Sequence, residues 1–229
     1  MSVRIIKGNI FASDLQVMVN TVNCVGVMGA GIALECRLRY PELYSKYVKF
    51  CQEGKIDIGK LWLFRGSERW VLNFPTKKHW KFPTREEYLD KGLSKFVETY
   101  ERLGITSIAF PLLGAQHGGL MPEKSLKVMR GYLDSLPIKI EIYEYDPCSP
   151  DDLYMEIRRK IAAMSVDQIS SSIGIGRNYA EKLLEAFGRE DLYQINQLGK
   201  LKGIGIKTLE RVFNYATGLM PNIETQLEF

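Results

Sequence analysis

The first 146 residues alternate between short strand-like segments and longer helix-like segments, and this alternation constrains the fold most. Segments rich in β-branched and aromatic residues, bounded by turn formers, span 3–7, 17–22, 61–65, 70–74, 107–110 and 138–145. Between them, apolar residues recur at helical spacing over 30–36, 41–53, 86–103 and 122–135. Alternating strands and helices predict an α/β domain over residues 1–146, with helices on both faces of one sheet.

The alternation stops at a segment rich in proline and aspartate, residues 146–152. Its composition is typical of a linker, which we assign to residues 147–151. Beyond it the pattern is helical, and the sequence Gly-Ile-Gly occurs at 174–176 and again at 203–205. We therefore predict a small all-α second domain over residues 152–218, followed by a tail at 219–229.

Charge differs between the two parts of this 229-residue chain, whose net charge is +4. Residues 1–150 carry 21 basic and 16 acidic side chains, whereas residues 151–229 carry 10 and 11. A basic excess favours a polyanionic partner for the first part.

Hydropathy and cysteine spacing exclude several classes of protein. No apolar run approaches the ~20 residues that cross a bilayer, and the first residues resemble no signal peptide. We expect a cytoplasmic protein without membrane contact. Cysteines 24, 36, 51 and 148 match no zinc pattern, so we expect reduced thiols and no metal.

Glycine-rich loops follow two of the predicted strands. The first holds glycines 26, 29 and 31, and Asn20 and Asn23 before it offer amides for sugar hydroxyls. Such a loop lets the backbone approach a ligand and directs N–H groups at an anion, although one loop alone is equally typical of a structural turn. The segment Phe110–Leu120 repeats the arrangement. Two such loops at adjacent strand ends suit a ligand with two phosphates.

These segments resemble the motifs of macrodomains. Residues 19–24 with 29–33 resemble the ribose-binding loop, and residues 113–120 resemble the diphosphate loop. Residues 73–80 resemble the DarG branch of DNA ADP-ribosyl glycohydrolases. The resemblance implies a three-layer α/β/α macrodomain with a mixed sheet. It also implies ADP-ribose contacts at Gly8, Asn9, Ile10, Asn20, Asn23, Gly29, Gly31, Ile32, Leu113, Gly114, Ala115, Gln116, His117, Gly118 and Gly119.

The same resemblance implies that Lys77 is the catalytic nucleophile, whereas residue order alone favours a solvated basic face. A neutral amine can attack the anomeric carbon of the distal ribose, or its opened aldehyde, and form a Schiff-base-like adduct. We expect neighbouring cations such as Lys78 to help keep Lys77 neutral. The expected reaction releases ADP-ribose from DNA bases without a cofactor, ADP-ribose being ligand and product. A two-carboxylate glycosidase is the alternative design, but the three motifs contain no acid.

The chain departs from its relatives at several positions. Gly118 aligns near an aspartate of the animal relative, and Ala115 replaces the usual cysteine. Met121 and Pro122 stand where the branch has Asp-Trp, and Asn9 stands where many macrodomains have an adenine-binding aspartate. These departures concern the bond that is cleaved and the contact to adenine.

Contacts to single-stranded DNA are expected from both parts of the chain. Trp80 would stack on an exposed base, with Lys78, His79, Lys81 and Arg85 around it, although a packing role for Trp80 is an equal alternative. The repeated Gly-Ile-Gly resembles paired helix-hairpin-helix motifs, whose N–H groups hold a DNA phosphate. This implies contacts at Gly174, Gly176, Arg177, Lys202, Gly203, Gly205 and Lys207. The near-neutral charge there keeps a packing or protein-binding role open.

Two other functions compete with hydrolysis of ADP-ribosyl DNA. One is a non-catalytic reader of ADP-ribosylated nucleic acid. The other is hydrolysis of ADP-ribose from proteins or of O-acetyl-ADP-ribose, which the basic segment around Lys77 disfavours. The resemblance also makes a DNA-ADP-ribosylating toxin an expected partner.

Overall fold

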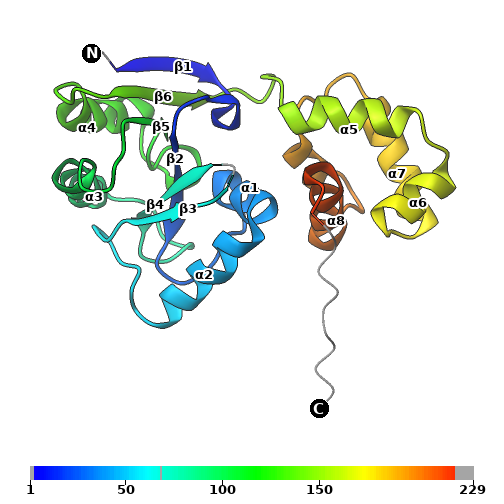
Figure 1. Ribbon diagram of the computed structural model, residues 1–229, viewed down its shortest axis with the longest axis horizontal. Coiled ribbons are helices and arrows are strands. Elements are labelled where there is room, and N and C mark those ends of the chain that lie inside the picture. Colours follow the sequence, from blue (N-terminus) through cyan, green and yellow to red (C-terminus); the bar gives the residue numbers. More distant parts are fainter. Residues whose placement is uncertain (1–2, 68, 220–229) are drawn as a thin grey trace. The chain divides into compact units, whose positions relative to one another are not determined.

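The computed structural model describes residues 3–67 and 69–219. The chain divides into two compact units, Met1–Asp146 and Pro147–Phe229 (Figure 1). Each unit has its own buried apolar residues. Among the described residues, no helix combines the length and apolar character that a membrane span requires.

The first unit is built on a six-stranded sheet in the order β1-β6-β5-β2-β4-β3. Its strands are β1 (Arg4–Gly8), β2 (Val17–Asn23), β3 (Trp62–Arg65), β4 (Trp70–Lys77), β5 (Ser107–Pro111) and β6 (Lys139–Tyr145). Neighbouring strands are parallel, except that β3 runs antiparallel to β4. The sheet is therefore mixed, and the six strands expected from the sequence are confirmed.

Helices cover both faces of this sheet (Figure 1). Helices α1 (Gly31–Arg39) and α2 (Pro41–Gln52) lie on one face, and α3 (Glu86–Thr99) and α4 (Pro122–Leu133) on the other. Alternate residues of β2 serve the two cores: Val17 and Val19 pack with α3 and α4, whereas Met18 and Val22 pack with α1 and α2. This two-residue period is what a strand buried on both sides requires. The predicted three-layer α/β/α arrangement is confirmed.

Strand β4 extends to Lys77, three residues further than the sequence pattern indicates. Proline cannot donate to a β-ladder, so Pro75 is unfavourable where a strand has neighbours on both sides. However, β3 pairs with β4 only as far as Asn73, so Pro75 lies where β2 is the one neighbour. Residues Val22 and Asn23 of β2 face Pro75 and Lys77, which leaves Thr76 unmatched. Such an irregularity redirects the side chains that follow it.

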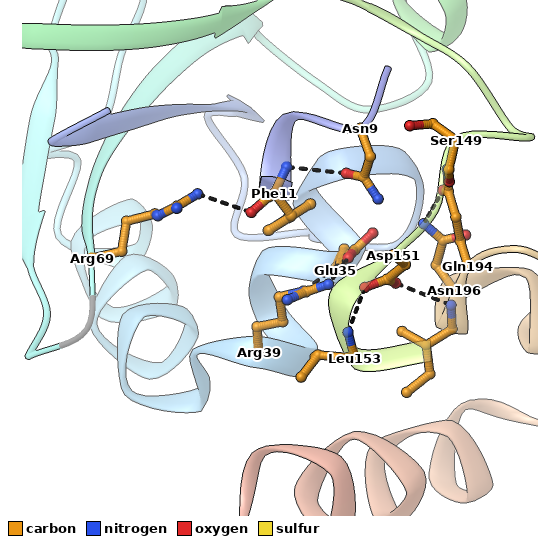
Figure 2. A network of polar contacts seen from close by, with 11 residues as sticks. Asn9, Phe11, Glu35, Arg39, Arg69, Ser149, Asp151, Leu153, Gln194 and Asn196 are labelled. Carbon is orange, nitrogen blue, oxygen red and sulfur yellow. Dashed lines mark hydrogen bonds and ion pairs between the residues drawn. The ribbon is translucent and has the colours of Figure 1, made fainter. Parts of the chain in front are cut away.

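The second unit contains α5 (Asp152–Ala162), α6 (Val166–Ile173), α7 (Arg177–Gly188), the 3-10 helix η3 (Ile195–Lys200) and α8 (Ile206–Thr217). Asp151 joins two of these elements, because its carboxylate accepts from the N–H of Leu153 at 3.0 Å and of Ile195 at 3.1 Å. Gln194 Nε2 donates to the carbonyl of Ser149 at 2.9 Å (Figure 2). These bonds fix the start of α5 against η3. Residues 220–229 of the predicted tail lie outside the described part of the chain.

Candidate functional site

Three loops meet at one edge of the sheet. Strands β5, β2 and β4 are adjacent and parallel, so the segments that follow them emerge side by side. These segments are residues 24–30, residues 78–85 and residues 112–121. The carboxyl edge of a parallel sheet is where α/β proteins bind their ligands.

Asn23 organises the first of these loops. Its side-chain oxygen accepts from the N–H of Val25 at 3.0 Å, the N–H of Val27 at 3.3 Å and the hydroxyl of Tyr47 at 3.2 Å. Its amide nitrogen donates to the carbonyl of Val27. Met28 is fully buried and anchors the loop in the core. The loop is therefore held in shape before any ligand binds.

The sequence predicts open amides at Asn20 and Asn23, but the structure uses both amides internally. Asn20 is fully buried, and its Nδ2 donates to Oδ1 of Asn73, its partner on β4, at 3.0 Å. The reason is its position: Asn20 precedes the end of β2 by three residues and lies between two neighbouring strands. Asn20 Oδ1 has no hydrogen-bond partner among the described residues, and the predicted contact of Asn20 and Asn23 with ADP-ribose remains a prediction.

Helix α1 begins at Gly31 directly after the first loop. Its N-cap residue Ala30 provides no side-chain hydrogen bond, so within the described residues no side chain caps the first turn. Uncapped N–H groups at a helix start suit an anion. Gly31 has φ of 55°, and a Cβ there would lie 2.9 Å from Cδ2 of His117. Glycine at this position thus lets the first and third loops touch.

The loop after β5 is anchored to α4 near its start and has a strained backbone at Gln116. Leu113 is fully buried, and its carbonyl accepts from the hydroxyl of Ser125 on α4. Gly114 has φ of 68°, and its carbonyl accepts from the N–H of Leu120 at 3.0 Å. Gln116 has φ of 46°, a left-handed conformation that costs a non-glycine residue about 1–2 kcal/mol. Strain of this kind concentrates at functional sites.

Thr84 fastens the second loop to the third. Its N–H donates to the carbonyl of Gly118 at 2.8 Å, and the residue is buried. A Cβ on Gly118 would lie 2.7 Å from Oγ1 of Thr84, and a Cβ on Gly114 would lie 2.7 Å from its Cγ2. The Oγ1 and Cγ2 atoms of Thr84 therefore occupy the space that side chains at positions 118 and 114 would need. Thr84 belongs to none of the three motifs, so its role could not be predicted from the sequence.

Lys77 ends β4, and its Nζ donates to the carbonyl of His117 in the loop after β5. Partial burial lowers the pKa of Lys77 below its ordinary value. The expectation that Lys78 contributes is wrong, because burial is the cause and Lys78 Nζ forms an ion pair with Asp57 instead. Successive side chains of an extended segment point to opposite sides, which separates the two amines.

Asp57 is an acid that the three motifs do not contain. Its carboxylate holds Lys78 and accepts from the N–H of Ile58 at 2.8 Å, and the bond to Lys78 lowers its pKa. Cys24 lies next to it, and burial followed by the charge of Asp57 raises the pKa of the Cys24 thiol to about 12. Cys24 Sγ donates to the carbonyl of Lys77 at 3.3 Å, and its N–H donates to that of Lys78. The first and second loops are thus also joined.

An aromatic turn follows Lys77 and Lys78. The N–H of Phe82 donates to the carbonyl of His79 at 3.1 Å, which closes the turn. Trp80 is 49% exposed and Phe82 is 63% exposed. The exposure of Trp80 disfavours the packing alternative for that residue, whereas Phe82 was not expected to contribute at all. Arg85 forms an ion pair with Glu87 at 3.5 Å.

Asn9 follows β1 at the same edge of the sheet, and its side chain is committed to a local cap. Its Oδ1 accepts from the N–H of Phe11 at 3.0 Å and so starts the 3-10 helix η1 (Ile10–Ala12) (Figure 2). Gly8, Asn9 and Ile10 are all buried. Arg69 donates to the carbonyls of Phe11 and Ser13 and holds η1 from outside. The predicted contact of Asn9 with adenine remains a prediction.

Both Gly-Ile-Gly segments of the second unit form hairpins that end at helix starts. Gly176 caps α7 and Gly205 caps α8, and the central isoleucines, Ile175 and Ile204, are buried. The predicted DNA-binding glycines and cations are exposed: Gly174, Gly176, Arg177, Lys202, Gly203, Gly205 and Lys207. Arg177 forms ion pairs with Asp167 and Glu181, whereas Lys202 and Lys207 have no acidic partner among the described residues.

Comparison with known proteins agrees with this geometry. Residues 19–129 match the family model described as Macro domain. A solved structure, the macrodomain of Thermus aquaticus DarG, is 39% identical, with a TM-score of 0.59 over 62% of this chain and 97% of that one. The chain belongs to the macrodomain family.

Two further similarities concern larger relatives of this macrodomain. The Thermus aquaticus DNA ADP-ribosyl glycohydrolase is 41% identical over 149 residues, which are 63% of this chain and 41% of that protein. The structure of Thermosipho africanus DarTG in complex with ADP-ribose is 32% identical, with a TM-score of 0.61, over 63% of this chain and 42% of that one. The chain thus matches about two fifths of the length of its curated relative, through the macrodomain.

Proposed function

We propose that this protein hydrolyses the bond between ADP-ribose and a DNA base, with Lys77 as the nucleophile. One observation carries the proposal: Lys77 has a lowered pKa and lies where the two glycine loops meet, in contact with the His117 carbonyl. The similarity to the DNA ADP-ribosyl glycohydrolase of Thermus aquaticus supports the same substrate class.

The proposed chemistry uses the neutral form of Lys77. Its Nζ bonds to the anomeric carbon of the distal ribose while the bond from that carbon to the base nitrogen breaks. The base keeps the electron pair and takes up a proton, and the amine loses one. Water then adds to the Schiff-base-like adduct, which releases ADP-ribose and restores the amine. The lowered pKa of Lys77 increases the neutral fraction that can react.

The glycine loops are proposed to hold the rest of ADP-ribose. The uncapped start of α1 at Gly31 and the glycines of residues 113–119 offer backbone N–H groups to the two phosphates. Because the loops touch at Gly31 and His117, one ligand can bridge them. The likeness to a DarTG structure in complex with ADP-ribose supports this arrangement.

The second unit is proposed to be a tandem helix-hairpin-helix domain that holds the DNA strand in a cytoplasmic protein. The paired hairpins with exposed glycines and buried isoleucines support this interpretation. Lys202 and Lys207 flank the second hairpin, which makes it the better phosphate site. A DNA-ADP-ribosylating toxin is the proposed source of the substrate, as the likeness to DarTG suggests.

Release of ADP-ribose from an ADP-ribosylated single-stranded oligonucleotide tests the function. The wild-type protein is expected to release it, and Lys77→Ala is expected to be inactive while still binding ADP-ribose. Lys124→Ala, a substitution of an exposed lysine on α4, is the matched control and should keep full activity. Normal turnover by Lys77→Ala would refute the lysine mechanism. Tight binding of ADP-ribose without hydrolysis by the wild type would indicate a reader instead.

A further inference from the structure

Residues 79–82 form an aromatic turn whose shape is fixed by its own contacts. The ring of His79 contacts both other rings, with centroid distances of 5.5 Å to Trp80 and 5.7 Å to Phe82. The N–H of Lys81 donates to Nδ1 of His79 at 3.2 Å, and the N–H of Phe82 donates to its carbonyl. The three rings therefore form one contiguous aromatic group.

Both ends of the segment that carries this turn are tied to the candidate site. At its start, the carbonyl of Lys78 accepts from the N–H of Cys24 at 3.3 Å. At its end, the N–H of Thr84 donates to Gly118 at 2.8 Å. Lys77, the proposed nucleophile, is two residues before His79. Whatever binds the aromatic turn is therefore held close to the bond that is broken.

The turn presents apolar surface to solvent together with positive charge. Phe82 is 63% exposed, and Trp80 is 49% exposed. Lys81 places its ammonium 5.1 Å from the Trp80 ring centroid and has no acidic partner among the described residues. Exposed aromatic rings beside cations are typical of surfaces that bind single-stranded nucleic acid. Residues 80–83 are four successive exposed residues, two of which are large aromatics, and exposing these rings to water does not stabilise the fold.

We propose that the aromatic turn binds an unpaired nucleobase next to the modified nucleotide. The base stacks on the open face of Phe82, which Trp80 and His79 support, and Lys81 contacts the adjacent phosphate. A base within a duplex already stacks on its neighbours, so the platform selects single-stranded substrate. This inference rests on the proposed function and extends it to the nucleotides beside the modification.

The test compares two substrates that share the same modified base: an ADP-ribosylated single-stranded oligonucleotide and the corresponding ADP-ribosyl nucleoside. Wild-type protein is expected to favour the oligonucleotide in kcat/KM. Phe82→Ala is expected to raise KM for the oligonucleotide about 5- to 100-fold, the range that loss of one stacked base produces. Its effect on the nucleoside should be much smaller, because the nucleoside has no neighbouring base.

Matched variants separate stacking from general packing. Phe82→Trp keeps an aromatic face and should retain the preference, whereas Phe82→Leu keeps apolar volume and should lose it. Ile5→Ala removes a side chain of 46% exposure on β1 and should change neither substrate. Equal losses on both substrates, or a Phe82→Leu variant that behaves like the wild type, would overturn the inference.

A binding measurement distinguishes failure of the inference from failure of the proposed function. If neither substrate is cleaved, the proposed function fails. Fluorescence anisotropy with an unmodified labelled single strand then still tests the turn. Weaker binding by Phe82→Ala than by Phe82→Trp would support the inference, and equal binding by both would overturn it.

Discussion

Substituting Gly118 by alanine tests whether Thr84 sets the shape of the loop of residues 112–121. The added Cβ would lie 2.7 Å from Thr84 Oγ1 and 3.3 Å from its Cβ. Optimal contacts are roughly 3.5 Å, so the first is short by about 0.8 Å. Thr84 cannot rotate away, because its other branch already lies against Gly114. Nor can it retreat without stretching its 2.8 Å bond to the Gly118 carbonyl.

Overpacking of this kind costs about 1–3 kcal/mol. If the strain is relieved by moving the loop, affinity for ADP-ribose falls by about 5- to 100-fold. Isothermal titration with ADP-ribose measures this loss directly. Adding Thr84→Ala should restore much of the affinity, because it removes the clashing hydroxyl. That hydroxyl has no hydrogen-bond partner among the described residues, so Thr84→Ala alone should cost roughly 1 kcal/mol or less.

Gly114→Ala serves as the contrasting variant in this cycle. Its φ of 68° and a 2.9 Å approach to Leu120 would remain strained after Thr84→Ala, so the second substitution should not rescue it. The reasoning fails if Gly118→Ala binds ADP-ribose like the wild type. It fails equally if the double variant of Gly118 and Thr84 binds no better than Gly118→Ala.

Three further predictions concern pH, the core and the second unit. Activity should rise with pH and level off below the ordinary pKa of lysine, because burial favours the neutral amine of Lys77. The free energy of unfolding should also rise with pH between the pKa of Lys77 in the folded chain and its higher pKa in the unfolded chain. Loss of that rise in Lys77→Met would confirm the sign. Gly92→Ala should lower the melting temperature by roughly 4–12 °C, because the added Cβ would lie 2.1 Å from Phe74 Cζ. Adding Phe74→Leu should restore part of the loss. An unchanged melting temperature of Gly92→Ala in calorimetry would contradict this packing. Asp151→Ala should destabilise the second unit by about 2–4 kcal/mol in urea titrations, because two N–H groups lose their acceptor oxygens. Asp151→Asn should cost less, because its one side-chain oxygen keeps one of the two bonds; equal costs would show that both oxygens are required.

The fold could be predicted from the sequence because two simple periods describe it. Residues of the strands are buried on both faces of the sheet or on alternate sides, and α2, α3 and α4 each carry one apolar stripe. The local pattern therefore predicts these elements. The sequence pattern ends the strand at residue 74, whereas β4 continues to Lys77. Whether the strand can continue through Pro75 depends on where β3 stops, which the local sequence does not show. Motif resemblance drew attention to the glycine loops and Lys77, which the structure brings together, whereas their roles in binding and catalysis stay predictions.

The contacts that join those loops could not be predicted in the same way. Thr84 and Asp57 belong to no motif, and they matter because of residues far away in the sequence, Gly118 and Lys78. The chemistry of Asn20 and Asn23 suits sugars, but the sequence does not show that their amide nitrogens donate within the protein, and their contact with ADP-ribose stays a prediction. A sequence gives the chemistry of a side chain, whereas its availability depends on which neighbours the fold brings to it.

Three residues of β4 determine the position of Lys77. Phe74 fits against Gly92 of α3 and sets how close β4 lies to that helix. Asn73 pairs with Asn20 and fixes the register between β4 and β2, a strongly directional bond in a fully buried place. The unmatched Thr76 then turns the strand end so that Lys77 meets the carbonyl of His117. Substitutions in the core beneath β4 should therefore change turnover as well as stability, even though they touch no part of the ligand.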